Sequence, residues 1–141
     1  MLMSQRRDRH SRGATKGVTL ARILIIDDEP LFLDILTMTI SGAGHDVETA
    51  SGGADGVDQA LASPPDLVIT DLSMPEVTGW DVIRRLKSEE ATGGVPIMAL
   101  SAHEQSGDRD EAFAAGCDAY ETKPLDFPRL AAKVEELLAG D

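Results

Sequence analysis

Residues 23–30 read Ile23-Leu-Ile-Ile-Asp-Asp-Glu-Pro30, an apolar run that ends in three carboxylates and a proline. Such an unbroken run, rich in isoleucine, is typical of a strand that is buried on both faces of a sheet. Pro30 suits the first turn of a helix, where a backbone N–H is not needed. The stretch therefore predicts a buried strand that ends in acidic residues and leads directly into a helix.

The rest of the chain repeats this order of strand and helix. Further strands are predicted at 47–50, 66–70, 95–100 and 117–121, and helices from Pro30, around Trp80, and at 54–62, 107–115 and 125–138. In the first helix, the spacing of a buried face is found at Leu31, Ile35, Leu36 and Ile40. Strict alternation of strands and helices predicts an α/β domain with a parallel sheet and helices on both faces.

Polar side chains follow four of the predicted strands. Asp27 and Asp28 come after the first strand, Asp71 after the third, Ser101 after the fourth and Lys123 after the fifth. Because the carboxyl ends of parallel strands meet at one edge of a sheet, where ligands bind, we expect these side chains to converge. Each residue taken alone has an ordinary explanation as a cap, a turn or a surface residue. Their joint occurrence indicates a functional site.

The chemistry of these residues narrows the kind of site. Carboxylates about 4 Å apart repel by roughly 4 kcal/mol at an effective dielectric of about 20, so three of them need a cation or raised pKa values. An all-oxygen ligand set suits Mg²⁺, which commonly bridges carboxylate and phosphate. A lysine ammonium and a serine hydroxyl can hold phosphoryl oxygens. Together they predict a site that forms and holds an aspartyl phosphate.

The composition fits one globular domain and excludes several classes of protein. The chain has 141 residues, of which 42% are hydrophobic, enough to bury a core. The single cysteine, Cys117, excludes an intramolecular disulfide framework and a Cys-rich zinc module, and it suits a reducing cytoplasm. No apolar stretch is long enough to span a bilayer, and the polar, Arg-rich N-terminus is unlike a secretory signal peptide.

Charge is distributed unevenly along the chain. Residues 1–20 carry five basic and one acidic residue, a net charge of +4, whereas residues 21–141 carry 8 basic and 24 acidic residues, a net charge of −16. So acidic a domain repels nucleic-acid phosphates and anionic membranes, and we expect it to bind neither directly. We expect the tail, 1–20, to be a disordered extension or a mis-assigned start; contact with an acidic partner, a membrane or DNA is the alternative.

Four motifs occur in order along the chain, at 23–30, 66–75, 99–102 and 119–124. Together they resemble the receiver domain of two-component response regulators, the CheY-like family. The resemblance covers about 21–139, so the chain divides into the tail 1–20 and a receiver domain at 21–141. It implies a flavodoxin-like, doubly wound, five-stranded parallel sheet of strand order 2-1-3-4-5.

The same resemblance implies a role for each residue of the acidic cluster. Asp71 would be the phosphoacceptor and, with its neighbours, a ligand of Mg²⁺. Asp28 would bind the metal directly and Asp27 largely through water. The backbone carbonyl of Ser73 would complete the protein ligands.

A second group of roles concerns the response to phosphorylation. By resemblance, Ser101 would be the switch hydroxyl and Lys123 would contact the phosphoryl group. Tyr120 would be the aromatic residue whose ring moves with the hydroxyl, rotating inward. The bond before Pro124 would be cis, as is typical of the family.

The resemblance implies a phosphoacceptor signalling protein rather than an enzyme that acts on other substrates. A sensor histidine kinase or a histidine phosphotransfer protein would exchange the phosphoryl group with it. Phosphorylation would alter the surface of the fourth helix, fifth strand and fifth helix, about 107–138, where a protein target or a second copy would dock. Since the sequence ends soon after the last predicted helix, we expect a stand-alone cytoplasmic regulator.

Two other classes of function fit parts of the pattern less well. A metal-dependent hydrolase with Asp71 as transient nucleophile would usually carry a second acidic residue two positions later, where this chain has Ser73. A nucleotide-binding protein would carry a glycine-rich phosphate loop after the first strand, where residues 27–30 stand instead.

Two groups of residues fall outside these main assignments. His10 and His45 have no evident partner in the sequence, and we expect both to be solvent-exposed. Ser73 and His103 each stand two residues beyond a principal site residue, where by resemblance the family tunes the lifetime of the phosphoryl group.

Overall fold

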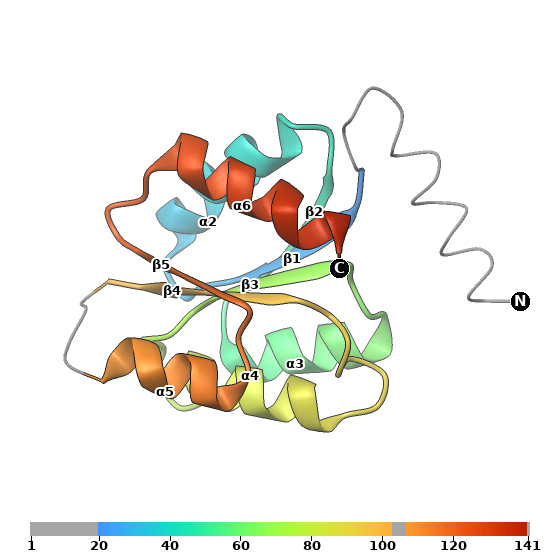
Figure 1. The fold of residues 1–141 in the computed structure, drawn as a ribbon, viewed down its shortest axis with the longest axis vertical. Helices are drawn as coiled ribbons and strands as arrows, with labels where there is room; N and C mark the ends of the chain where they lie inside the picture. Colours follow the sequence, from blue (N-terminus) through green and yellow to red (C-terminus); the bar gives the residue numbers. More distant parts are fainter. Residues whose placement is uncertain (1–19, 103–106, 141) are drawn as a thin grey trace, which may run out of the picture.

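The computed structural model describes residues 20–102 and 107–140, which form one parallel sheet with helices on both sides (Figure 1). Within these residues the strands are β1 (Arg22–Ile26), β2 (Asp46–Ala50), β3 (Leu67–Asp71), β4 (Ile97–Ser101) and β5 (Ala119–Thr122). The helices are α2 (Pro30–Ser41), α3 (Gly53–Ala62), α4 (Gly79–Ser88), α5 (Asp108–Ala115) and α6 (Phe127–Ala139). The strands lie side by side in the order β2-β1-β3-β4-β5, all parallel, which confirms the predicted fold class and strand order.

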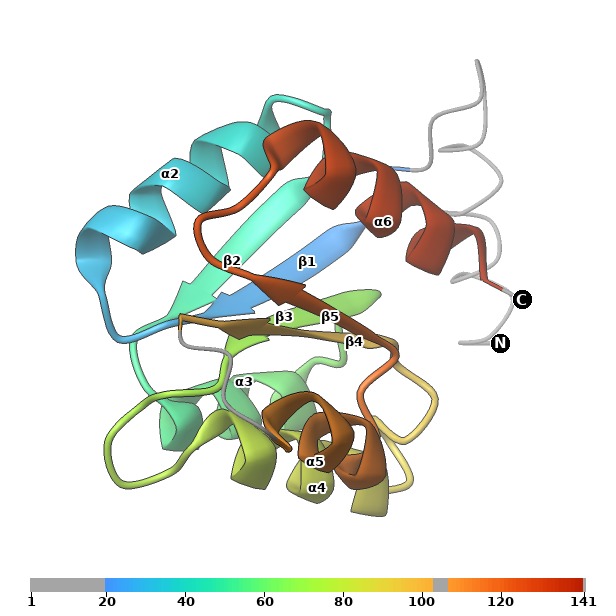
Figure 2. The same ribbon diagram turned by 60° about the vertical axis from the view of Figure 1, so that its left-hand side comes forward.

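The helices form one layer on each face of the sheet. Helices α2 and α6 cover one face and α3, α4 and α5 the other, as Figures 1 and 2 show from two directions. In β1, Ile23 and Ile25 pack in the core on the α2–α6 side, and Leu24 and Ile26 in the core on the opposite side. Because successive strand residues alternate between faces, the apolar run of β1 is buried on both.

Side-chain caps fix the ends of two helices. The Thr78 hydroxyl accepts a hydrogen bond from the Asp81 N–H at 3.2 Å, and the Asp81 carboxylate accepts one from the Thr78 N–H, so α4 begins with a reciprocal capping box. The Asp126 carboxylate accepts from the Arg129 N–H at 3.1 Å, which starts α6 at Phe127, two residues later than predicted. The other predicted elements agree with the observed bounds to within two residues.

The apolar face of α2 differs in part from the prediction. Leu36 and Ile40 are buried as expected, but Leu31 is 69% and Ile35 40% exposed. Met38 is also largely exposed. Helix α2 carries apolar side chains around most of its circumference, so their spacing alone does not define which side packs on the sheet.

The prediction that His45 is solvent-exposed is wrong. Its side chain is buried, with Nδ1 accepting a hydrogen bond from the Ala21 N–H at 3.1 Å. Nε2 lies 2.8 Å from the Glu135 carboxylate of α6. Because Nδ1 acts as an acceptor, the neutral ring donates from Nε2. The ring therefore joins the start of β1 to α6, while His10 and His103 lie outside the described residues.

The peptide bond between Lys123 and Pro124 is cis, as the resemblance implied. Among residues 20–102 and 107–140, no helix combines the length and the apolar character needed to cross a membrane. Of the tail, 1–20, residues 1–19 lie outside the described residues.

Candidate functional site

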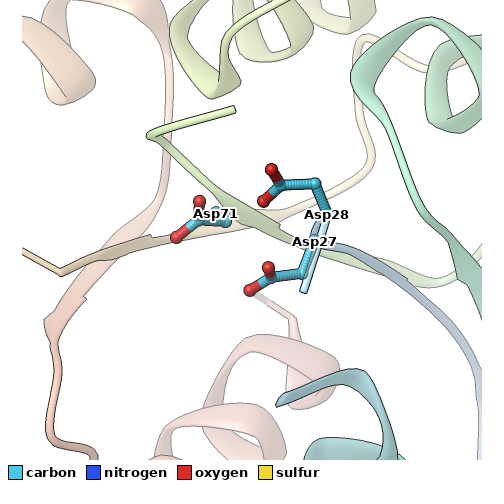
Figure 3. A group of neighbouring side chains, drawn as sticks. All are labelled: Asp27, Asp28 and Asp71. Carbon is cyan, nitrogen blue, oxygen red and sulfur yellow. The ribbon is translucent and has the colours of Figure 1, made fainter. Parts of the chain in front are cut away.

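The carboxylates predicted to converge do meet at the carboxyl edge of the sheet. Asp27 and Asp28 leave the end of β1 and turn toward Asp71 at the end of β3, as Figure 3 shows. One carboxylate oxygen from each of the three lies within 4.8 Å of the others. Asp27 and Asp71 are buried, whereas Asp28 is exposed, so the cluster opens to solvent on the side of Asp28.

Asp27 is held by one contact from a residue close to it in sequence and by one from Lys123, which follows β5. Its Oδ1 accepts a hydrogen bond from the Glu29 N–H at 3.0 Å, and its Oδ2 accepts one from Lys123 Nζ at 3.3 Å. Burial raises the pKa of Asp27, although the Glu29 N–H and the Lys123 ammonium oppose this effect. These two contacts fix the Asp27 side chain in place.

Lys123 follows β5 and brings a positive charge to the carboxylates. Its Nζ lies 3.1 Å from Asp71 Oδ1, and its backbone N–H donates to the Ser101 carbonyl at 2.8 Å. Burial lowers the pKa of Lys123, but the carboxylates of Asp71 and Asp27 outweigh it, and the pKa is raised. The ammonium therefore stays charged beside Asp71.

Asp71 has the most unusual environment of the three acids. Burial, followed by repulsion from the Asp27 carboxylate, raises its pKa from 3.8 to about 6, with Lys123 acting in the opposite direction. Its Oδ1 is buried and, although close to the lysine ammonium, accepts no well-aligned hydrogen bond from any described residue. A buried carboxylate oxygen with unused capacity is poised to bind a cation or to attack an electrophile.

The donor set fits a hard divalent cation. The oxygens of Asp27, Asp28 and Asp71 are close enough to share an ion. Asp71 Oδ1 accepts no well-aligned hydrogen bond from the described residues, and a bound ion would satisfy this oxygen instead. Carboxylate oxygens without histidine or cysteine favour Mg²⁺ over softer metals. Ser73 is exposed in the loop that follows β3, and the role of its carbonyl as a further ligand stays a prediction.

Of the two predicted switch residues, Ser101 lies at the end of β4 and Tyr120 lies within β5. Ser101 ends β4 and is 2% exposed. Tyr120, in β5, is also buried, and its hydroxyl has no hydrogen-bond partner among residues 20–102 and 107–140. The Arg109 guanidinium lies over the Tyr120 ring, 5.6 Å from its centroid. The Tyr120 ring therefore lies inside the protein.

Sequence reasoning missed one residue at this site. The ring of Phe32, in the first turn of α2, lies with its centroid 3.9 Å from Lys123 Nζ. The sequence does contain a sign of this contact, because an aromatic residue stands four positions after Asp28, in a helix that begins next to the acidic residues. The sign is easily overlooked, because Phe32 is one of many apolar residues in α2 and looks like an ordinary core residue.

Comparison with known proteins places the chain in a family. The family model for the response regulator receiver domain matches residues 23–135. The chain is 40% identical over 119 residues to the DNA-binding dual master transcriptional regulator RpaA of Synechocystis sp., covering 84% of this chain and 49% of that protein. It therefore spans about half the length of that relative.

Two further comparisons extend over nearly whole chains. The protein PilH of Pseudomonas aeruginosa is 35% identical over 121 residues, which cover 86% of this chain and 100% of PilH. The crystal structure of the receiver domain of a signal transduction histidine kinase from Syntrophus aciditrophicus is 30% identical, with a TM-score of 0.80, covering 85% of this chain and 91% of that one. With the family model matching most of its length, the chain belongs to the response regulator receiver domains of two-component signalling.

Proposed function

We propose that Asp71 accepts a phosphoryl group in an Mg²⁺-dependent phosphorelay and that the chain acts as a switch rather than as an enzyme on other substrates. The observation that carries the proposal is the position of Asp71. Its buried Oδ1 lies 3.1 Å from Lys123 Nζ and beside the carboxylates of Asp27 and Asp28. This combination of nucleophile, positive charge and cation ligands supports phosphoryl transfer.

In the proposed step, the phosphoryl group comes from a phosphohistidine of the donor protein. One Asp71 carboxylate oxygen attacks phosphorus as the bond from phosphorus to the histidine nitrogen breaks. The donor imidazole leaves with that electron pair, and the product is an aspartyl phosphate. Lys123 offsets the negative charge on the phosphoryl oxygens. Mg²⁺, held by Asp27, Asp28, Asp71 and the Ser73 carbonyl, would supply further charge compensation when bound.

The donor is proposed to be a sensor histidine kinase or a histidine phosphotransfer protein, which fits membership of the two-component family. The output would be a docking surface for a protein target or a second copy, formed by α5, β5 and α6. The net charge of −16 at 21–141 argues against direct DNA binding by the domain. A cytoplasmic location suits its partner kinases and its single cysteine.

The hydrolase alternative gains no support from the site. Ser73, where such an enzyme would usually carry its second acid, is a neutral, exposed residue. Within the described residues, the carboxylates gathered around Asp71 are those of Asp27 and Asp28, which the proposal assigns to metal binding.

Incubation with Mg²⁺ and a small phosphodonor such as acetyl phosphate is expected to add one phosphoryl group to the protein. Asp71→Asn should abolish the addition because the amide is a poor nucleophile. Intact-mass measurement under mild conditions, with Phos-tag electrophoresis, checks this result. Undiminished labelling of the Asn variant would place the acceptor elsewhere.

A second variant in the same assay tests the metal. Asp28→Ala removes the exposed carboxylate of the cluster but leaves the contacts of Asp71 with Lys123. It should weaken Mg²⁺ affinity and slow labelling by roughly tenfold or more. Asp34→Ala, which removes an exposed acid of α2, is the matched control. Equal Mg²⁺ affinities in both variants would contradict a direct role for Asp28.

Ser101→Ala is expected to leave phosphorylation possible while weakening the response of residues 107–138. A charge-assisted hydrogen bond contributes about 1.5–3 kcal/mol, whereas moving an equilibrium from 1:99 to 99:1 takes about 5.5 kcal/mol. Lys123 must therefore contribute with Ser101. Because the Tyr120 ring is already buried, we expect its surroundings to change rather than its exposure. Amide chemical shifts before and after phosphorylation test this, and equal responses in both proteins would refute it.

A further inference from the structure

The ammonium of Lys123 is in contact with an aromatic ring as well as with two carboxylates. Nζ lies 3.9 Å from the centroid of the Phe32 ring, 3.1 Å from Asp71 and 3.3 Å from Asp27. A cation over an aromatic face within about 6 Å is attracted by the ring quadrupole. The contact is therefore short enough to influence the position of the ammonium group.

The ring of Phe32 is itself held in place. It is half-buried and packs against the core cluster under α2 and α6, which includes Leu33 and Leu130. The lysine side chain, in contrast, is long and has many rotamers to lose when it is fixed. A rigid ring against the ammonium therefore restricts a group that would otherwise move.

The ring also changes the solvation of the ammonium. Lys123 is 17% exposed at its side chain, and Phe32 presents an apolar face where water would otherwise solvate the charge. Because an ammonium group is strongly hydrated, replacing water on one side strengthens its interaction with nearby anions. The neighbouring anions here are Asp27 and the acceptor Asp71.

We propose that Phe32 is a positioning residue for phosphoryl transfer, holding the Lys123 ammonium against Asp71 through its ring face. The proposal rests on the proposed function of Asp71 and adds a residue from α2 to that site. Phe32 acts through Lys123 and needs no contact with the phosphoryl group.

Phe32→Leu is expected to slow Mg²⁺-dependent labelling of Asp71 by roughly 2- to 30-fold, the range that a cation–π contact supports. Phe32→Tyr keeps a ring face and should restore a rate within about twofold of the wild type. Phe127→Leu is the matched control, since Phe127 also packs, partly buried, against the same core cluster. This control should label at the wild-type rate.

A double-mutant cycle separates positioning of the lysine from a general effect on the fold. In a Lys123→Gln background, Phe32→Leu should change the remaining rate by less than about twofold, because the charge that the ring contacts is gone. An equal slowing in both backgrounds would show that Phe32 acts independently of Lys123 and would overturn the proposal.

A spectroscopic measurement tests the contact without phosphorylation. The ε-methylene protons of Lys123 should show an upfield ring-current shift in the unphosphorylated protein, lost in Phe32→Leu and kept in Phe32→Tyr. The chain has four lysines, so Lys123→Gln assigns the signal directly. Absence of the shift in the wild type overturns the contact, whereas absence of labelling in the wild type overturns the proposed function.

Discussion

Asp71→Asn is expected to stabilise the metal-free fold by about 1–3 kcal/mol near neutral pH. In the folded protein the pKa of Asp71 is raised from 3.8 to about 6, first by burial and then by Asp27. Ionised Asp71 is therefore less favourable in the folded chain than in the unfolded chain. Asparagine keeps the shape and removes the charge, and with it both the repulsion from Asp27 and the opposing attraction to Lys123 that the pKa of about 6 already includes.

The pH dependence follows from the direction of this shift. Below about pH 4 the carboxyl group is protonated in both states, so it adds no penalty. Between about pH 4 and 6 the folded chain binds more protons than the unfolded chain, and the wild type loses stability relative to the variant as pH rises. Above about pH 6 the difference stays constant.

Denaturant unfolding of both proteins in EDTA from about pH 3.5 to 8 measures this difference. Saturating Mg²⁺ should stabilise the wild type more than the variant, since ligand binding favours the folded state. A difference that does not change with pH, or a variant less stable than the wild type near neutral pH, would contradict the electrostatic explanation.

Gly79→Ala is expected to lower the free energy of unfolding by about 2–4 kcal/mol. A Cβ on Gly79 would lie 2.2 Å from the Asp71 carbonyl oxygen and 2.6 Å from Leu72 Cα. Both are backbone atoms, one in the last residue of β3 and one in the residue that follows, so relief of the clash requires a shift of the backbone that carries Asp71. Labelling of Asp71 should therefore slow as well.

Gly94→Ala is the control for this substitution. A Cβ there meets no atom within 4 Å, and Gly94 is exposed. Thermal and urea unfolding should show a change within about 0.5 kcal/mol of the wild type for Gly94→Ala. Similar stabilities of the two alanine variants would show that β3 and α4 can separate at little cost.

The fold and most of the site could be predicted because both depend on local patterns. The run before Asp27 predicts a strand buried on both faces, and the alternation of elements predicts parallel pairing. The convergence of Asp28, Asp71 and Lys123 follows, since parallel strands bring their carboxyl ends to one edge. The strand order came from the resemblance of four motifs to a known family.

The features that could not be predicted depend on how helices pack. Residues Leu31 and Phe32 are adjacent in an apolar helix, yet one is exposed and the other lies against Lys123. The rotation of α2 about its axis decides between them, and an apolar pattern spread around the helix leaves that rotation open. His45 was predicted wrongly for a related reason, because its partner Glu135 is 90 residues away in sequence.

The backbone hydrogen bonds at the edge of the sheet have a consequence for how the molecule can respond. The Leu72 N–H donates to the Leu100 carbonyl at 2.9 Å, and the Lys123 N–H donates to the Ser101 carbonyl at 2.8 Å. These bonds join β3 to β4 and β4 to β5 next to Asp71, Ser101 and Lys123. Opening the site between β3 and β4 would separate two inner strands of the sheet, at a cost close to that of global unfolding. Side chains and the flanking helices can therefore rearrange while the backbone around Asp71 keeps its shape.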